Sequence, residues 1–335
     1  MIPKWQPGMT LRNANGDVDP SSLGYDFTIQ TTTALRAKVV EQKFYEVAPA
    51  DFLPIEVGTG AWQESIVTPR TFDLAGDFEQ GITNVSAGPA RIAEVDAGLD
   101  SVTADIATWV KGYRYTVPEL EKALASMNWN VVESKHRALK RNFDLGFQKV
   151  AFLGLKSNGT RFPGLLTQSE VNIDTTTITS NISAMDAADF QTLVAGILYA
   201  YANNANFTEM PDVFVMPMAD YLGMGAAASP DFPMVSKMDY LLKAFKELTQ
   251  NPNFKIMPLA YADKARNVGF TDSDGVNRYV LYKKDPDNLL ITVPVNFVMN
   301  APGTSNNFQW EGVAYAQFTG VALFRPRTVL YFDHE

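Results

Sequence analysis

The stretch "VVESKHRALKRNFDLGFQKVAFLG", residues 131–154, decides the fold that this sequence predicts. Its apolar residues recur at spacings of 3, 4 and 7, which places them on one broad face of a helix. They are Val132, Leu139, Phe143, Phe147, Val150 and Leu153. About 25 residues at a rise of ~1.5 Å make a rod of roughly 38 Å, with Asn128 or Asn130 placed to cap its start. A rod with a single apolar stripe must lie on a sheet or on another helix.

The segment "NGTRFPGLL", residues 158–166, follows this helix and combines two glycines with a short apolar exit. We expect Gly159 and Gly164 to let the backbone turn sharply there. Phosphate binding is the alternative, but no Lys followed by Ser or Thr stands in P-loop spacing. The segment therefore predicts a structural turn.

The residues before the long helix predict an arm, strands and a short helix. Residues 1–46 are polar and rich in turn residues, which favours an extended arm. Residues 90–117 alternate apolar and polar side chains, which predicts a long paired strand. The run "TVPE", residues 116–119, predicts a capping box with Pro in the first turn of a helix that ends near Met127.

The second half mixes helices and strands. Helical periodicity covers 186–204 and 236–250, and the second helix opens with a capping box from Ser236 to Asp239. Strand-like runs occupy 212–217, 254–262, 278–284, 288–300, 308–326 and 328–332. No βαβ period connects them, so we expect an α+β protein. The predicted division of the chain is 1–46, 47–110, 111–185, 186–300 and 301–335.

The composition of the 335 residues excludes several classes of protein. A net charge of -9 argues against a protein that reads nucleic acid, because such proteins cluster Lys and Arg against phosphates. The absence of cysteine excludes disulfides and thiolate metal sites. No apolar run approaches the ~18 residues of a membrane span, and the start lacks a signal-peptide core.

Catalytic chemistry is sparse in this sequence. His136 and His334 are the two histidines, one in a basic helical stretch and one beside the C-terminus, so the sequence argues strongly against a histidine triad or a multi-histidine metal site. The 37 acidic residues leave a glycosidase-like carboxylate pair open as an alternative. The run "DSDG", residues 272–275, favours a hairpin turn over a calcium loop, because no bidentate Glu follows it. We expect no catalytic residue, no cofactor and no metal.

Taken in order, these pieces resemble the major capsid protein of tailed bacteriophages, which has the Hong Kong 97-type fold. That family runs from an N-terminal arm through an extended β-hairpin loop and a short helix to a long spine helix. A compact α+β axial domain follows, and the last strands return to the sheet of the spine. Residues 115–129 match the approach to the spine, 130–155 the spine, and "FTGVALFRPRTVLYF", 318–332, the closing strands.

The resemblance implies a shell protein that assembles with itself, as hexamers and pentamers, into an icosahedral head around double-stranded DNA. It implies a virion component assembled in the host cytoplasm, with a portal, a scaffolding protein and a decoration protein as further partners. Packaged DNA would be met by non-specific proximity only, and no membrane is involved. An encapsulin shell is the nearest alternative, and a small-molecule enzyme is the alternative of another class.

Two segments of opposite charge suggest where subunits meet. Residues 51–110 hold ten acids and two bases, a balance of -8, whereas 111–156 hold nine bases and four acids, a balance of +5. In the resembled fold the hairpin of one subunit crosses the spine region of the next, so we expect these segments to meet between subunits. The residues expected at this contact are Trp62, Arg70, Phe72, Asp73, Asp77, Phe78, Arg137, Lys140 and Arg141. Packing within the subunit and exposure of the basic run to solvent or to the genome are the alternatives.

Two expectations concern maturation. In some relatives, a lysine of the hairpin loop forms a covalent cross-link between subunits. No lysine stands between Lys43 and Lys111 in this sequence, so we expect no such cross-link. Relatives with a fused scaffold lose an N-terminal extension. This sequence starts at Met1 without one, so we expect a separately encoded scaffold and no cleavage at this end.

Overall fold

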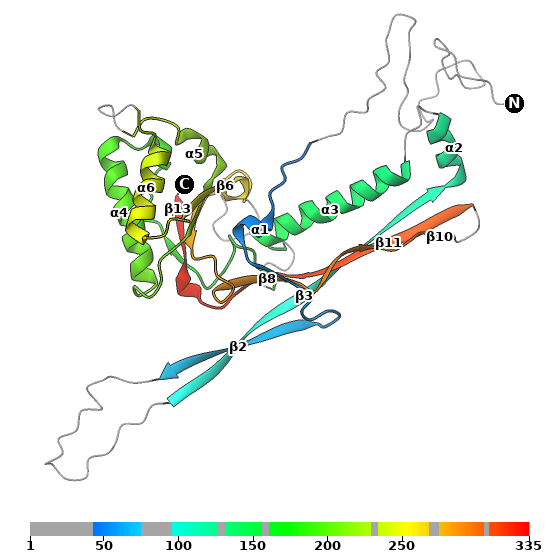
Figure 1. Ribbon diagram of the computed structural model, residues 1–335, viewed down its shortest axis with the longest axis horizontal. Coiled ribbons are helices and arrows are strands. Elements are labelled where there is room, and N and C mark those ends of the chain that lie inside the picture. The colour runs from blue at the N-terminus through cyan, green and yellow to red at the C-terminus, as the bar shows by residue number, and fades with distance from the viewer. Residues whose placement is uncertain are drawn as a thin grey trace, which may run out of the picture.

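The computed structural model describes residues 43–74, 96–125, 131–155, 161–228, 234–267, 275–304 and 308–334. Figure 1 shows three parts: a long helix lying along a long sheet, a compact group of helices and strands, and a two-stranded ribbon that projects from the body. Among the helices in these ranges, none is long and apolar enough to cross a membrane.

The long helix α3, Val131–Leu153, lies on a five-stranded sheet. The sheet has the order β10 (Gly303–Thr304), β11 (Gln309–Thr319), β3 (Asp96–Thr116) and β2 (Ser65–Leu74), with β9 (Val295–Met299) also paired to β11. β11 and β3 run antiparallel from the pair Gln309–Thr116 to Thr319–Ile106. The apolar stripe of α3 packs on this sheet, with Leu139 against Tyr113 and Phe143 against Phe318. The helix is therefore where the periodicity predicts it, and the surface that covers its stripe is a sheet.

The short helix α2, Val117–Ala125, follows β3 directly. Glu119 accepts a hydrogen bond from Lys135 Nζ at 2.5 Å, so its carboxylate ties α2 to α3. Asn128, Asn130 and Met127, to which the sequence assigns the cap and the helix end, lie outside the described residues.

The compact part is built on a second five-stranded sheet. Its order is β4 (Asn172–Asp174), β13 (Val329–His334), β7 (Asn277–Tyr282), β5 (Val213–Pro217) and β6 (Lys255–Leu259). The helices α4 (Ala187–Asn204), α5 (Met218–Gly223) and α6 (Lys237–Thr249) cover it, together with the 3₁₀ turns η4 (Ile182–Ala184), η5 (Ala260–Ala262) and η6 (Pro326–Thr328). Ser236 caps α6 by accepting from the Asp239 N–H at 3.1 Å, which confirms the predicted cap.

A third, three-stranded sheet joins the two parts. It has the order β1 (Ile55–Val57), β8 (Leu289–Val293) and β12 (Val321–Leu323), and the short helix α1 (Pro49–Phe52) precedes it. One cluster of buried residues runs from α1 through the end of α3 to this sheet and to β7 and β13, including Phe52, Phe152, Tyr282, Ile291 and Tyr331. Because this core is continuous, α3 and the compact part are fixed to each other.

The last strand differs from what the resemblance implies. Of the strands in 301–335, β11 does return to the sheet beside α3, but β13 pairs with β7 and β4 in the compact part. All residues of β13 are buried, and its two faces contribute to different cores. A run that is apolar on both faces is stable only inside a sheet that is covered on both sides. The division of the chain at 186–300 and 301–335 stays a prediction.

The turn after α3 also differs from its prediction. The left-handed residue that ends the helix is Gly154, with φ of 77°. Gly164 is required for a different reason, since a Cβ there would stand 2.5 Å from the carbonyl carbon of Phe152. Its role is therefore a close approach of two backbone segments and not a sharp turn. Gly159, Asp272 and Asp274 lie outside the described residues.

Candidate inter-subunit surfaces

The ribbon formed by β2 and β3 is the first candidate surface. The strands pair antiparallel from Ser65–Asp105 to Leu74–Asp96, and Figure 1 shows this ribbon projecting beyond the rest of the molecule. In the described part of the chain no third strand flanks β2. An isolated two-stranded ribbon is marginally stable in water, so this one gains most from a surface outside its own subunit.

One face of the ribbon is exposed and uncharged over three cross-strand pairs. The pairs are Val67–Thr103, Pro69–Ser101 and Thr71–Leu99. Val67 is 58% exposed and Leu99 73% exposed, and because directly opposed residues share a face, both point to the same side. This ribbon face offers apolar and hydroxyl groups to a partner without a charge to desolvate.

The opposite face of the ribbon holds Arg70 within its own subunit. Arg70 Nε and Nη2 donate to Asp100 Oδ2 at 2.8 and 2.6 Å, and Nη1 donates to the carbonyl of Phe324 at 3.2 Å. The guanidinium holds the pKa of Asp100 below its usual value. The structure thus places Arg70 in a contact with its own chain. The side chains of Phe72 and Asp73, and the residues Asp77 and Phe78, lie outside the described part.

Trp62 belongs to a second exposed apolar surface, on the side of the sheet away from α3. Its ring lies 5.7 Å from that of Tyr315, and the side chain is 66% exposed. Tyr315 is paired with Val110, which is 61% exposed, and both alternate with the residues that contact α3. Trp62 has a φ of 63°, a left-handed conformation that is costly for an aromatic residue.

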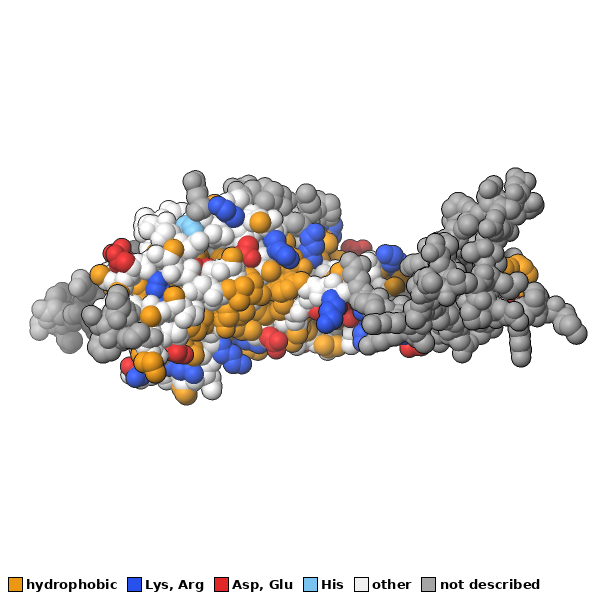
Figure 2. All heavy atoms as spheres, turned by 90° about the horizontal axis from the view of Figure 1, so that it is seen from above, with side chains coloured by type: hydrophobic (Ala, Val, Ile, Leu, Met, Phe, Trp, Pro, Cys, Tyr) orange, Lys and Arg blue, Asp and Glu red, His pale blue; other side chains and the backbone are white. Residues whose placement is uncertain are grey.

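The basic residues of α3 have different surroundings. Arg137 pairs with Glu133 one turn away at 3.1 Å. Arg141 lies 3.7 Å from Glu46 and 5.5 Å from the ring of Phe44, so it binds the segment that precedes α1. Lys140 is exposed. Figure 2, seen from above the view of Figure 1, shows Lys and Arg side chains beside a band of hydrophobic side chains on the upper side of the molecule.

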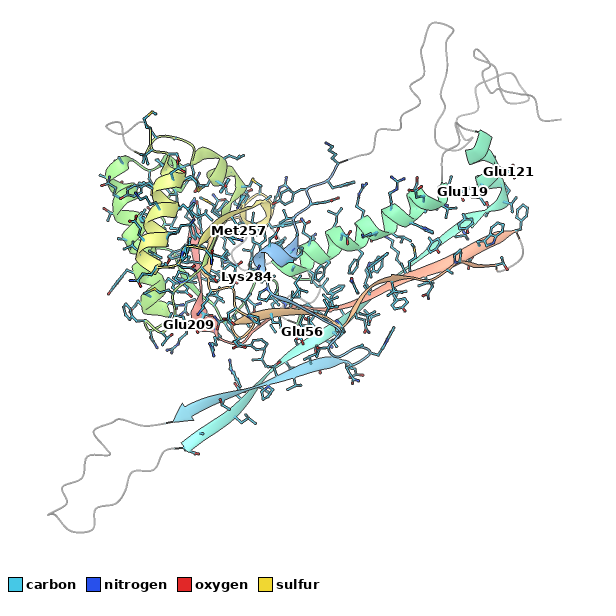
Figure 3. All side chains as sticks on the ribbon, in the orientation of Figure 1. Glu56, Glu119, Glu121, Glu209, Met257 and Lys284 are labelled. Atoms are coloured by element: carbon cyan, nitrogen blue, oxygen red, sulfur yellow. The ribbon has the colours of Figure 1, made fainter. Side chains whose placement is uncertain are left out.

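Two charged residues labelled in Figure 3, Glu209 and Lys284, make contacts that stabilise the fold. Glu209 pairs with Arg325 at 2.9 Å and with Lys283 at 3.6 Å. Lys284 Nζ donates to the carbonyls of Ala50 and Asp51, and burial lowers its pKa. Within the described ranges, no group of three metal-ligating side chains converges.

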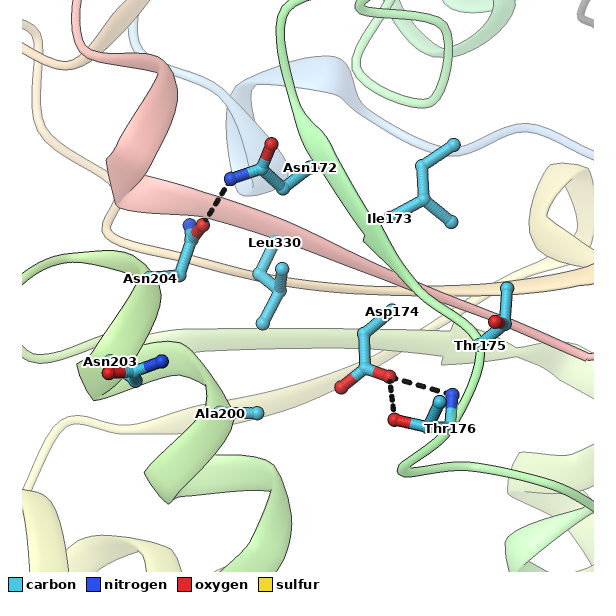
Figure 4. A pocket seen from close by; sticks show the side chains of 9 residues that line it. All are labelled: Asn172, Ile173, Asp174, Thr175, Thr176, Ala200, Asn203, Asn204 and Leu330. Carbon is cyan, nitrogen blue, oxygen red and sulfur yellow. Dashed lines mark hydrogen bonds between the residues drawn. The ribbon is translucent and has the colours of Figure 1, made fainter.

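A shallow cavity of about 390 Å³ lies between β4 and α4 (Figure 4). Asn172 donates to Asn204 Oδ1 at 2.7 Å, and Asp174 accepts from both the N–H and the hydroxyl of Thr176 at 2.7 Å. Burial raises the pKa of Asp174, but hydrogen bonds from Thr177 and Thr176 outweigh it and the pKa falls. The polar groups satisfy one another at the rim, which is the behaviour of a structural loop.

The sequence did not predict three groups whose exposure or burial the tertiary structure shows. The first is the exposed pair Val67 and Leu99, which strand alternation places on one face but whose exposure depends on the absence, among the described residues, of any layer packed on that face. The others are the buried carboxamides of Gln148 and Gln317, each bonded to the main chain of the N-terminal half. Nothing in the local sequence distinguishes these glutamines from surface glutamines.

Comparison with known proteins identifies the family. A family model described as "Major capsid protein" matches residues 83–334, well over half of the chain. The fold is similar to that of the capsid of Myoviridae phage XM1, with a TM-score of 0.75 and 13% identity over 90% of this chain and 97% of that one. It is also similar to a Mycobacterium phage Ogopogo chain, with a TM-score of 0.56 and 12% identity over 90% and 96% of the two chains.

A capsid of a native GTA particle matches with a TM-score of 0.58 and 10% identity, covering 93% of this chain and 99% of that one. No curated protein matches the chain. Because these identities are low, the solved structures show the fold alone. They confirm the α+β capsid fold that the sequence predicts. With the family model spanning most of the chain, the protein belongs to the major capsid protein family.

Proposed function

We propose that copies of this chain, arranged as hexamers and pentamers, close into the icosahedral head that encloses the double-stranded DNA of a tailed phage. The observation that carries this proposal is the projecting ribbon with its exposed, uncharged face, in a chain of the major capsid protein family. Closed shells form when identical contacts repeat between copies, and a projecting element provides such a contact. The family match is to a viral capsid family, so it does not favour the encapsulin alternative.

Electron microscopy of the purified full-length chain tests this function. We expect closed particles of uniform size when the chain is produced together with a scaffolding protein from the same genome. The chain produced alone should give few or aberrant particles. Dispersed subunits at high concentration in both preparations would contradict the shell function, and abundant uniform particles from the chain alone would contradict the separate scaffold.

The ribbon of one subunit, we propose further, docks on the spine region of the next. Two features support this docking: the uncharged ribbon face of Val67 and Leu99, and the opposite charge of segments 51–110 and 111–156. Each exposed ion pair is worth only about 0–1 kcal/mol, but the contact repeats in every copy of a shell. Burial of the apolar face supplies the larger part of the energy per subunit.

Two sets of variants test this docking separately. The double variant Val67→Lys, Leu99→Lys should leave the folded subunit as stable as the wild type and abolish particles, because both side chains are exposed in the free subunit. Leu248→Lys, at a residue of α6 that is 57% exposed, is the matched control. Particles formed by the ribbon variant at the wild-type yield would contradict the docking.

The charge contribution is tested with Lys140 and not with Arg141, because Arg141 already binds Glu46 within the subunit. Lys140→Glu should weaken assembly, and adding Asp73→Lys and Asp77→Lys should restore part of it. If the combined variant assembles no better than Lys140→Glu alone, the two segments do not meet.

The remaining partners follow from the proposed head. A portal would occupy one vertex, a scaffolding protein would guide assembly, and a decoration protein would bind the outer surface of the shell. DNA would be enclosed without sequence recognition, in agreement with the net charge of -9. Particles purified from infected cells and analysed by mass spectrometry would identify the proteins that accompany this chain.

A further inference from the structure

A buried glutamine of α3 holds the segment that precedes α1. Gln148 is 2% exposed, and its Oε1 accepts the N–H of Val47 at 2.9 Å. Its Nε2 donates to the carbonyl of Tyr45 at 3.3 Å and to the hydroxyl of Tyr261 at 3.2 Å. One carboxamide thus uses its acceptor and one of its donated bonds on residues 43–48, which are in neither helix nor strand.

The groups that Gln148 binds belong to the main chain. The carbonyl of residue 45 and the N–H of residue 47 are a pair that a neighbouring β-strand would bind on one edge of an extended segment. The carboxamide therefore acts in place of a strand, and it recognises an extended backbone whatever its side chains are. The ring of Tyr45 packs beside Tyr261 at 6.1 Å, and its hydroxyl accepts from the N–H of Ala260 at 3.2 Å.

A second buried glutamine makes the same kind of contact at the root of the ribbon. Gln317 of β11 is 3% exposed, and its Oε1 accepts the N–H of Trp62 at 3.0 Å. Its Nε2 donates to the hydroxyl of Thr108 at 3.0 Å. Trp62 has a left-handed backbone, and a residue in that conformation persists only where its surroundings hold it. Gln317 is one such contact, and the ring of Tyr315 is another.

We propose that Gln148 and Gln317 are a pair of main-chain clamps that set the directions in which the described end of the N-terminal arm, residues 43–48, and the ribbon leave the body. Gln148 acts at the end of the arm, just before α1, and Gln317 acts just before β2. The stretch between them is held by the parallel pairing of β1 with β8. The inference rests on the proposed function where it assigns the arm and the ribbon to contacts between copies.

The chemistry of the clamps suits such a role. A carboxamide is neutral, so its hydrogen bonds do not weaken with salt as exposed ion pairs do, and they do not titrate. Burial makes the bonds obligatory, because a buried amide group without a partner is costly. The hydrogen bonds of the clamps are thereby independent of ionic strength, whereas the contact of Arg141 with Glu46 in the same arm segment is not.

Hydrogen–deuterium exchange of the unassembled, full-length subunit tests the clamps directly. Gln148→Leu should speed exchange in a peptide covering 43–48 up to about tenfold, the effect of losing one net hydrogen bond, and leave a peptide covering 60–64 unchanged. Gln317→Leu should do the reverse, so each variant is the control of the other. Tyr261→Phe removes only the hydroxyl that Gln148 Nε2 contacts, and it should give a smaller change at 43–48 if Gln148→Leu does not fold.

Assembly of the same variants tests the consequence. We expect both glutamine variants to lower the yield of closed particles severalfold, with an unchanged salt dependence of the particles that do form. Unchanged exchange at 43–48 in the Gln148→Leu and Tyr261→Phe variants would overturn the clamp, and so would a loosened segment with normal particles. If the wild type itself forms no particles, the proposed function fails, while the exchange result still decides whether the clamps exist.

Discussion

At the scale of single residues, Asp144 on α3 makes the subunit's stability depend on pH. Asp144 is exposed, but partial desolvation raises its pKa, Lys140 lowers it, and the nearby carboxylate of Glu46 raises it again, with a net upward shift whose effect on stability solvent screening keeps small. The folded state therefore binds this proton more tightly than the unfolded chain does. The contribution of the group to stability is complete below the ordinary carboxyl pKa and is lost as pH rises through the raised value.

Asp144→Asn should consequently raise the melting temperature at neutral pH, and the gain should vanish as the pH falls below the ordinary aspartate pKa. Thermal unfolding measured across this range checks the prediction. Glu133→Gln is the control with the opposite sign, because Glu133 lies in the first turn of α3 and pairs with Arg137. A loss of stability in Asp144→Asn at neutral pH would contradict the assignment.

Arg278 shows how burial decides how much the loss of an ion pair costs in the free energy of unfolding. It binds both oxygens of Asp333, at 2.8 and 2.7 Å, and donates to the carbonyl of Leu166, with both charged side chains only 5% exposed. Arg278→Leu leaves a buried carboxylate and a carbonyl without this partner, so we expect a loss of about 3–5 kcal/mol in the free energy of unfolding. Arg137→Ala, which breaks an exposed pair, should cost at most ~1 kcal/mol. Similar losses in denaturant titrations of the two variants would refute this contrast.

At the scale of elements, two glycines should respond oppositely to alanine in their free energy of unfolding. Gly146 lies inside α3, and Gly164 lies in the segment that follows the helix. Gly146 is within the helix, and a Cβ there would meet no atom within 4 Å, so Gly146→Ala should stabilise by roughly 0.5–1 kcal/mol through helix propensity. A Cβ on Gly164 would meet the backbone of Phe152 and Gly154 at 2.5 Å, so Gly164→Ala should destabilise by about 1–3 kcal/mol. Chemical denaturation measures the change in the free energy of unfolding of both variants, and a neutral Gly164→Ala would show that the two backbone segments can move apart.

At the scale of the whole molecule, the shell should be held by non-covalent contacts. No lysine stands between Lys43 and Lys111, so the ribbon region lacks the amine that a lysine cross-link requires. Particles boiled in detergent should run on a gel as a single band at the mass of one subunit. A ladder of multimers from purified particles would refute this expectation.

The sequence alone predicted the parts that depend on local patterns. The stripe from Val132 to Leu153 predicts α3, the alternation before it predicts β3, and Ser236 predicts the start of α6. These features need only neighbours within a few residues, and their order along the chain gave the resemblance to phage capsid proteins. The same patterns fixed the fold class, because the apolar faces of helices and strands must be covered by one another.

Only the tertiary structure decided which partner each apolar or polar group meets. β13 is apolar on both faces, and its place between β7 and β4 depends on two cores that come from distant segments. Arg70 and Arg141, which the charge balance assigned to contacts between subunits, bind groups of their own chain. Gln148 and Gln317 are polar residues whose burial follows from residues more than 100 positions away. Long-range packing and hydrogen bonding set these outcomes, and no local spacing in the sequence encodes them.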